Sequence, residues 1–238
     1  MDANRVLQFG LVKLPIGLLV LFVGLSVAVF ITEKIARKKQ LAKDEWTNII
    51  FTLSLVFLIF YKFGWVIFDI KSVLKNPASL IWTTGSPTTI LISTVVSALV
   101  FLYLIKKHKY PLFTILDLSW LTIAITLFLY NLFIVDYGKV TDLFFGIALQ
   151  EGSKFNYHPI NWYRVLWVGI LLIVRFTKWS DLNYAKLLYL YILLGLGLLL
   201  ISIFDISFNL VFGFTFNQWA FLALITLGGV GLIKTSVD

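Results

Sequence analysis

Long runs of apolar residues alternate with short polar stretches along the whole chain. Each run is continuous and about 20 residues long, which is the length of a helix that crosses the hydrocarbon core of a bilayer. Strands of a membrane barrel would instead alternate apolar and polar positions. The pattern therefore predicts membrane-spanning helices at Pro15–Ile31, Ile49–Asp69, Thr88–Ile105, Leu112–Val135, Trp162–Thr177, Ala185–Ile206 and Gln218–Ile233.

About seven such helices predict an all-α integral membrane protein, with residues 1–238 as a single polytopic membrane domain. Composition agrees, because 60% of the residues are apolar and the mean hydropathy is +0.93. The spans and their connections use most of the 238 residues, so no sizeable soluble domain is expected. Polar side chains within hydrocarbon are costly, so the few that lie in or beside spans are the first candidates for function.

Residues that commonly hold metals or carry thiol chemistry are scarce. The chain has no cysteine, which excludes a disulfide framework, a thiolate metal site and a cysteine nucleophile. His108 and His158 are its two histidines, and a clustered histidine metal site is not expected from so few. The sequence therefore predicts no metal and no cofactor.

Basic residues are unevenly divided between the two sides of the predicted membrane. With seven spans, twelve lysines and arginines fall on one side, including the run from Lys34 to Lys43, and seven fall on the other. Short basic connections stay in the cytoplasm, so we expect the N-terminus outside and the C-terminus in the cytoplasm. The net charge of +8 then faces anionic lipid, and no nucleic-acid partner is expected.

The first apolar run is predicted to be a retained span and not a signal peptide. A strongly basic stretch follows it, and no small-residue cleavage site separates the two.

Several short motifs follow one another in an order that resembles one known family. The first span with EKIARKKQLAKDEW, then FYKFGWVIFD, NPASLIW and KKHKYPLFTILDL, all look like family segments. The most specific pieces are YGKVTDLFFG and HPINWYR, in which His158, Pro159 and Tyr163 keep the family spacing, and Gln218 and Trp219 resemble the start of its last span. Over about 220 residues the chain resembles the prolipoprotein diacylglyceryl transferases of bacterial membranes.

The resemblance implies a multi-pass protein of the bacterial plasma membrane with a role in lipoprotein biosynthesis. The family transfers the diacylglyceryl group of phosphatidylglycerol to the lipobox cysteine of a preprolipoprotein on the outer side. Implied partners are therefore phosphatidylglycerol and a lipoprotein or another membrane protein. Such chemistry needs cations that stabilise phosphate charge and a group that assists deprotonation of the thiol.

The chain departs from the family at its main catalytic motifs. Where the family has an HGG motif before the third span, this chain reads TTGSPT, without histidine. Leu127 or a neighbour occupies the arginine position of the fourth span, and no arginine follows Arg175. Lys62 stands where the second-span arginine usually lies, and Arg164 replaces the glutamate of the HP motif. Whether the chain is an enzyme is therefore left open by the resemblance.

A lipid-headgroup site is predicted in the outer half of the bundle, formed by Lys62, Arg164, Tyr163 and Asn131, with His158 as a candidate general base. Each residue also has a structural alternative. Lys62 lies about 10 Å inside its span and is able to snorkel to the headgroups. His158 would shape a turn, and Arg164 would anchor the interface. Asn131, like Asp117, would hydrogen-bond between helices.

The sequence thus predicts a divergent transferase-like membrane protein that binds phosphatidylglycerol or a lipoprotein-like substrate at the outer leaflet. One alternative is an active diacylglyceryl transferase with rearranged catalytic groups. The other is a non-catalytic membrane protein that binds a protein partner. A transporter or channel is less favoured, because the sequence shows no acidic pair, no broken-helix repeat and no polar stripe.

Overall fold

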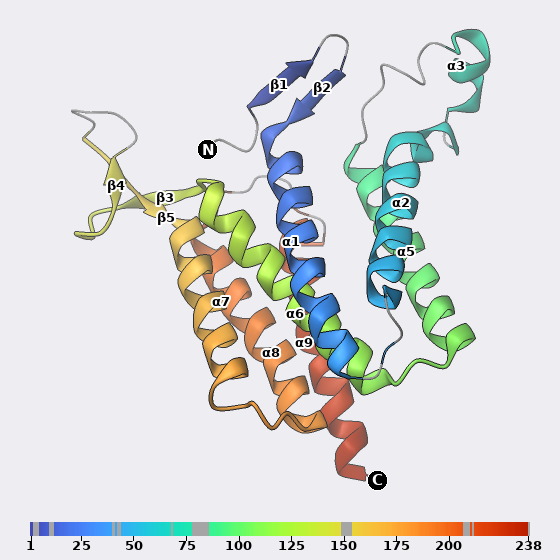
Figure 1. The fold of residues 1–238 in the computed structure, drawn as a ribbon. Helices are drawn as coiled ribbons and strands as arrows, with labels where there is room; N and C mark the ends of the chain where they lie inside the picture. The colour runs from blue at the N-terminus through green and yellow to red at the C-terminus, as the bar shows by residue number, and fades with distance from the viewer. Residues whose placement is uncertain are drawn as a thin grey trace. The chain divides into compact units, whose positions relative to one another are not determined.

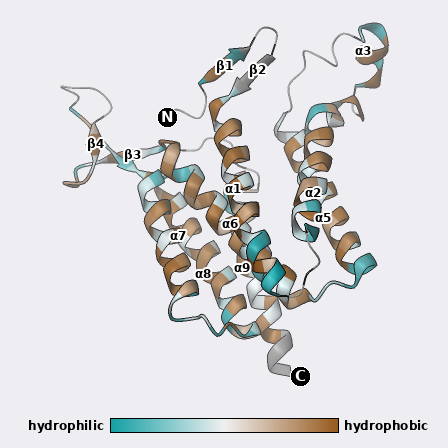
Figure 2. Cartoon of the chain, in the orientation of Figure 1, coloured by the Kyte–Doolittle hydropathy of each residue, from teal (hydrophilic) through white to brown (hydrophobic). Residues whose placement is uncertain are grey.

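A computed structural model describes the chain except for residues 2–4, 10–11, 40, 42–43, 68, 78–85, 149–153, 207–209, 211 and 238. The described residues are mainly helical, as predicted for the all-α class, with two small antiparallel sheets in addition (Figure 1). Among these residues, six helical segments are long and apolar enough to cross a membrane, and hydrophobic colours run along them in Figure 2. The chain is therefore a helical membrane protein.

Contacts within the chain divide it into two compact units, each described by itself. Unit 1 comprises residues 1–28 and 116–238, and unit 2 comprises residues 29–115. Helix α1 (Ile16–Lys38) and helix α6 (Leu112–Phe133) each contribute to both units.

Unit 1 is a helical bundle with a small sheet at one end of its helices. Its other helices are α7 (Ile160–Phe176), α8 (Tyr184–Ile201) and α9 (Phe216–Val237), and a 3-10 turn, η2 (Ser202–Phe204), follows α8. Helix α8 packs closely along α9 and also against α7. The buried side chains are mostly apolar, and the largest come from α6 and α8: Trp120, Leu118, Leu121, Leu187, Leu190, Tyr191 and Leu194.

Two sheets of unit 1 adjoin its helices. Strands β1 (Val6–Phe9) and β2 (Val12–Pro15) form an antiparallel hairpin that leads directly into α1. Strands β3 (Tyr137–Thr141), β4 (Ile147–Ala148) and β5 (Asn156–Pro159) form a second sheet in the order β3-β5-β4. Because β3 follows α6 and β5 precedes α7, this sheet ties the end of one helix to the start of the next.

Unit 2 is built on the packing of α2 (Glu45–Phe63) against α5 (Pro87–His108), with the 3-10 turn η1 (Gly64–Ile67) and the short helix α3 (Ile70–Lys75) between them. The turn from α1 into α2 is held by Glu33, which accepts hydrogen bonds from the backbone N–H groups of Asp44 and Thr47 at 2.8 and 3.0 Å. Ser86 and Thr89 cap the start of α5 by exchanging side-chain and backbone hydrogen bonds.

Every predicted span contains a helix, but some boundaries and connections differ from the prediction. Helix α1 continues to Lys38, so the basic stretch after the first span is largely helical, supported by an ion pair between Arg37 and Glu33. The connection between the fourth and fifth predicted spans contains a sheet, and the residues before the first span form a hairpin. Part of the connection between the second and third predicted spans, residues 78–85, lies outside the described residues.

Candidate functional site

A cluster of polar side chains lies where α6 ends and α7 begins in unit 1. This polar cluster consists of Asp136, His158, Asn161, Tyr163, Arg164 and Asp205. Pairing of β3 with β5 sets Tyr137 opposite Pro159, which brings the residue after α6 close to the first turn of α7. Asp205 follows η2 and enters from the end of α8.

Arg164 links these elements through two carboxylates. Its Nη1 donates to Asp136 Oδ2 at 2.7 Å, and its Nη2 donates to both carboxylate oxygens of Asp205 at 2.9 and 2.7 Å. The side chains of Arg164 and Asp205 are only 12% and 16% exposed. Burial raises the pKa of Asp205, and Asp136 adds to that rise, while Arg164 acts in the opposite direction. The guanidinium therefore stabilises buried negative charge that belongs to the protein itself.

His158 and Tyr163 form a hydrogen-bonded pair beside this arginine. His158 Nδ1 lies 2.9 Å from Tyr163 Oη, and the direction of the proton depends on the imidazole tautomer. The imidazole ring of His158 packs 4.6 Å from the ring of Phe204, and Phe145 meets Tyr163 edge to face. Aromatic side chains thus enclose a pair that is able to donate and accept hydrogen bonds but carries no permanent charge.

Two buried polar atoms of the cluster have no protein partner among the described residues: Asn161 Oδ1 and Arg164 Nε. Asn161 is 2% exposed, and its Nδ2 donates to the backbone oxygen of Asn131 at 3.3 Å. An unsatisfied buried polar atom costs about 1–3 kcal/mol, so each one marks a place where a polar ligand or water would be stabilised.

The structure brings four of the five predicted site residues to the same end of unit 1. His158, Tyr163 and Arg164 lie in or beside the first turn of α7. Asn131 lies near the end of α6, where its side chain donates to Leu127 O of its own helix at 2.7 Å and its backbone oxygen contacts Asn161. Lys62 belongs to unit 2, where it lies partly buried in the last turn of α2.

Asn161 and Asp205 were not singled out from the sequence. Asn161 is the polar residue inside HPINWYR that lies one helical turn from Arg164, and Asp205 is a charged residue directly after an apolar run. Both were recognisable as polar residues in or beside predicted spans. The proximity of Asn161 to Arg164 follows from helical spacing, whereas that of Asp205 depends on the packing of α8 against α7, which no local pattern shows.

A second arginine–carboxylate pair lies at the other end of α7. Arg175 Nε and Nη2 donate to Asp117 Oδ1 and Oδ2 at 3.2 and 3.0 Å, and Asp117 is fully buried. Nearby, Tyr191 Oη donates to Leu116 O at 2.8 Å. The predicted alternative for Asp117, a hydrogen bond between helices, is thus confirmed, and this pair joins α6 to α7.

Within the described part of the chain, no group of three or more histidine, aspartate or glutamate side chains is arranged to hold a metal ion. No protein-family model matches the sequence, and no curated protein matches it either. The resemblance to diacylglyceryl transferases therefore stays a prediction, and the site has to be interpreted from its own geometry.

Proposed function

We propose that the protein is a divergent, transferase-like membrane protein that binds phosphatidylglycerol or a lipoprotein-like substrate at the outer leaflet and does not transfer a diacylglyceryl group. The observation that carries this proposal is the polar cluster, in which Asn161 Oδ1 and Arg164 Nε are buried without protein partners beside the His158–Tyr163 pair. The glycerol hydroxyls of a phosphatidylglycerol headgroup both donate and accept hydrogen bonds, so they suit this mixture of donors and acceptors.

The charges of the cluster support binding without transfer. Transfer of a phosphate-linked group needs cations that face the phosphate in the transition state. Here Arg164 already pairs with Asp136 and Asp205, so the three charged groups sum to −1 when both carboxylates are ionised. The negative charge of a phosphate is disfavoured at such a place. Among the described residues, the His158 ring hydrogen-bonds to Tyr163 and not to a carboxylate that would make it a stronger base.

The proposal includes seven spans, with the N-terminus outside. At 17 residues, α7 lies at the short end of the range for a spanning helix. It packs against α8, and ion pairs tie both of its ends to α6 or the residues that follow α6, through Asp136 near its start and Asp117 near its end. These contacts support a helix that crosses the membrane together with its neighbours. The uneven distribution of lysine and arginine then supports an external polar cluster.

Native mass spectrometry tests whether the protein binds phosphatidylglycerol. The protein is extracted with a mild detergent from membranes of known lipid composition. We expect phosphatidylglycerol to be retained in preference to phosphatidylcholine, and a His158→Phe, Asn161→Leu double variant to retain about tenfold less, as expected for loss of hydrogen bonds to a headgroup. His108→Phe, which changes the other histidine, is the matched control and should retain as much as wild type.

The claim about catalysis has its own assay. Incubation with labelled phosphatidylglycerol and a lipobox peptide should leave the cysteine unmodified, and expression should not rescue cells depleted of their diacylglyceryl transferase. Transfer of the label, or full rescue, would establish the active-enzyme alternative.

A second candidate function, binding of a lipoprotein or another membrane protein, is favoured by the turn between β3 and β4. Phe144 in this turn is 97% exposed, and its neighbours Leu143 and Phe145 are exposed as well. Contiguous exposed apolar residues of this kind mark surfaces that contact a partner or a membrane. A photoreactive amino acid at position 144 distinguishes a protein partner from a membrane. Cross-links to protein would support binding of a lipoprotein or another membrane protein, and cross-links to lipid alone would contradict it.

A further inference from the structure

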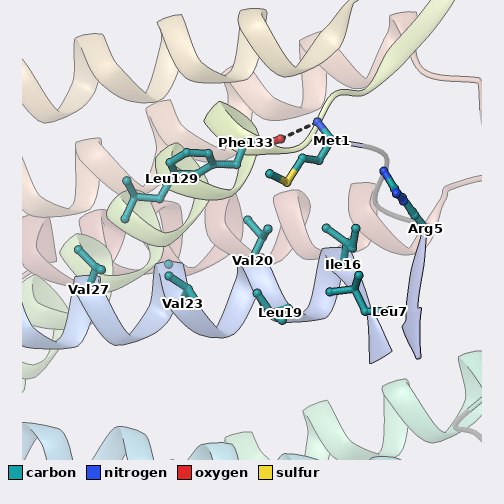
Figure 3. Close-up of a pocket in the computed structure, with 11 residues that line it drawn as sticks. Met1, Arg5, Leu7, Ile16, Leu19, Val20, Val23, Val27, Leu129 and Phe133 are labelled. Atoms are coloured by element: carbon teal, nitrogen blue, oxygen red, sulfur yellow. Dashed lines mark hydrogen bonds between the residues drawn. The ribbon is translucent and has the colours of Figure 1, made fainter. Parts of the chain in front are cut away.

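An apolar groove runs along the first half of α1 in unit 1. It has a volume of about 760 Å³ and lies between α1, strand β1 and the second half of α6. Its walls are almost entirely aliphatic and aromatic, as Figure 3 shows for Leu19, Val20, Val23, Val27, Leu129 and Phe133. This volume is within the range of pockets that enclose a small-molecule ligand.

The dimensions of the groove match part of a lipid. From Ile16 to Val27 the helix advances eleven residues, or about 16 Å at helical rise. One leaflet accounts for half of a hydrocarbon core of about 30 Å. Several wall residues, including Val23 and Phe133, are more than half exposed, so the groove is open along one side. In a membrane such an opening faces acyl chains and not water.

A cationic side chain lies at one end of this apolar surface. Arg5 lines the groove, and its backbone oxygen accepts a hydrogen bond from Ile16 N at 2.8 Å, which holds it at the start of α1 (Figure 3). The Arg5 side chain is exposed. The groove therefore changes from aliphatic to cationic at the level where α1 begins, as a lipid changes from acyl chain to phosphate.

The cationic end of the groove lies beside the polar cluster. Met1, which also lines the groove, donates from its nitrogen to Phe133 O at 2.9 Å and accepts at its backbone oxygen from Val135 N at 2.9 Å. Val135 precedes Asp136 of the polar cluster. The cluster has its arginine neutralised, whereas Arg5 has no ion-pair partner within the described part of the chain.

We infer that the groove binds one acyl chain of an anionic glycerophospholipid, whose phosphate pairs with the Arg5 guanidinium. This inference rests on the proposed function, since it names where the chain and the phosphate of the bound lipid lie. Arginine forms short, bidentate hydrogen bonds with phosphate, and its charge distinguishes an anionic headgroup from a zwitterionic one. The apolar walls supply affinity in proportion to the methylenes that they cover.

Photocross-linking in nanodiscs tests the site directly. The probe is phosphatidylglycerol with a diazirine near the middle of one acyl chain, present in a background of phosphatidylcholine. In wild type we expect cross-linked peptides from residues 16–27 and 129–133. Val23→Trp fills the groove and should reduce the yield of these cross-linked peptides about tenfold, and Arg5→Glu should reduce it to a similar extent. Leu21→Trp places the same bulk on α1 outside the groove and should leave cross-linking unchanged.

The outcomes separate this inference from the proposed function. If wild type retains phosphatidylglycerol but Val23→Trp and Arg5→Glu cross-link as strongly as wild type, the groove site is wrong and the polar cluster still accounts for binding. If the diazirine analogue of phosphatidylcholine labels the groove equally well, the pairing of a phosphate charge with Arg5 is wrong. If wild type shows no preference for phosphatidylglycerol in any assay, the phosphatidylglycerol binding of the proposed function is refuted, and this inference with it.

Discussion

The environment of Arg164 differs from that of a lipid-facing cation, because the side chain is largely buried and paired with two carboxylates. Replacing it by glutamine leaves Asp136 and Asp205 without a counter-charge, and Asp205 is mostly buried. We expect a loss of about 3 kcal/mol in unfolding free energy, the low end for breaking a buried ion pair because Asp136 is partly exposed. Thermal unfolding followed by tryptophan fluorescence measures this loss of stability. Arg164→Lys is the control, because it keeps the positive charge and should lose less unfolding free energy.

The pH dependence of Arg164→Gln gives a second prediction from the same residue. Burial already raises the pKa of Asp205, and loss of the arginine raises it further. The fold then favours the protonated carboxyl, so stability is greatest at low pH and falls as pH rises through the raised pKa. As pH rises above the usual aspartate pKa of about 4, the variant should therefore lose melting temperature relative to wild type. A difference that stays constant as pH rises would contradict the raised pKa.

Arg175 and Asp117 allow a test of a buried pair that lies away from the polar cluster. Arg175→Leu removes the counter-charge of a fully buried carboxylate and should cost about 3–5 kcal/mol, whereas the double change Arg175→Leu, Asp117→Leu should recover most of that loss. A double-mutant cycle measured by thermal unfolding gives the interaction free energy between Arg175 and Asp117. Retention of phosphatidylglycerol by the double variant should stay near the wild-type level, and a large loss would mean that this pair also serves the lipid site.

Among the secondary-structure elements, the helices were predictable and the sheets were not. A run such as Leu112–Val135 contains about as many apolar residues as a span needs, so helix α6 follows from local composition. The strand β5, by contrast, reads NYHP and carries no alternating pattern. It is a strand because β3 and β4 pair with it on both sides, and that pairing depends on residues up to about twenty positions away.

The packing of α8 on α9 depends on two glycines. A Cβ atom on Gly195 would lie 2.6 Å from Phe221 O, and one on Gly228 would lie 2.6 Å from Leu188 O, so each helix approaches the backbone of the other. Glycine lacks a side chain, so both backbones approach more closely here than any other residue would allow. Gly229, the neighbour of Gly228, has no atom within 4 Å of such a Cβ.

We therefore expect Gly228→Ala to separate α8 from α9, with a loss of roughly 1–3 kcal/mol of stability from the forced backbone shift. Gly229→Ala is the matched control. It should be neutral or slightly stabilising, because alanine favours the helix and meets open space. Equal melting temperatures for the two alanine variants would contradict this account of the helix crossing.

For the whole molecule, the sequence indicated the class of protein more fully than the site. His158 and Tyr163 were found together because they are five residues apart and share one motif. The role of Arg164 was harder to foresee, because its partners Asp136 and Asp205 lie 28 and 41 positions away. Only the fold shows that both carboxylates meet the same guanidinium.

Orientation in the membrane is the property on which the proposed external site depends, and the absence of native cysteine makes it directly measurable. Single cysteines at Lys154, in the connection between β4 and β5, and at Lys38, at the end of α1, should react differently with a membrane-impermeant maleimide in intact cells. We expect labelling at position 154 from outside and at position 38 only after permeabilisation, because the basic end of α1 favours the cytoplasm. Tryptophan fluorescence of each variant checks that it is folded. The reverse labelling pattern would place the polar cluster in the cytoplasm, where neither an outer-leaflet lipid nor an exported lipoprotein is able to reach it.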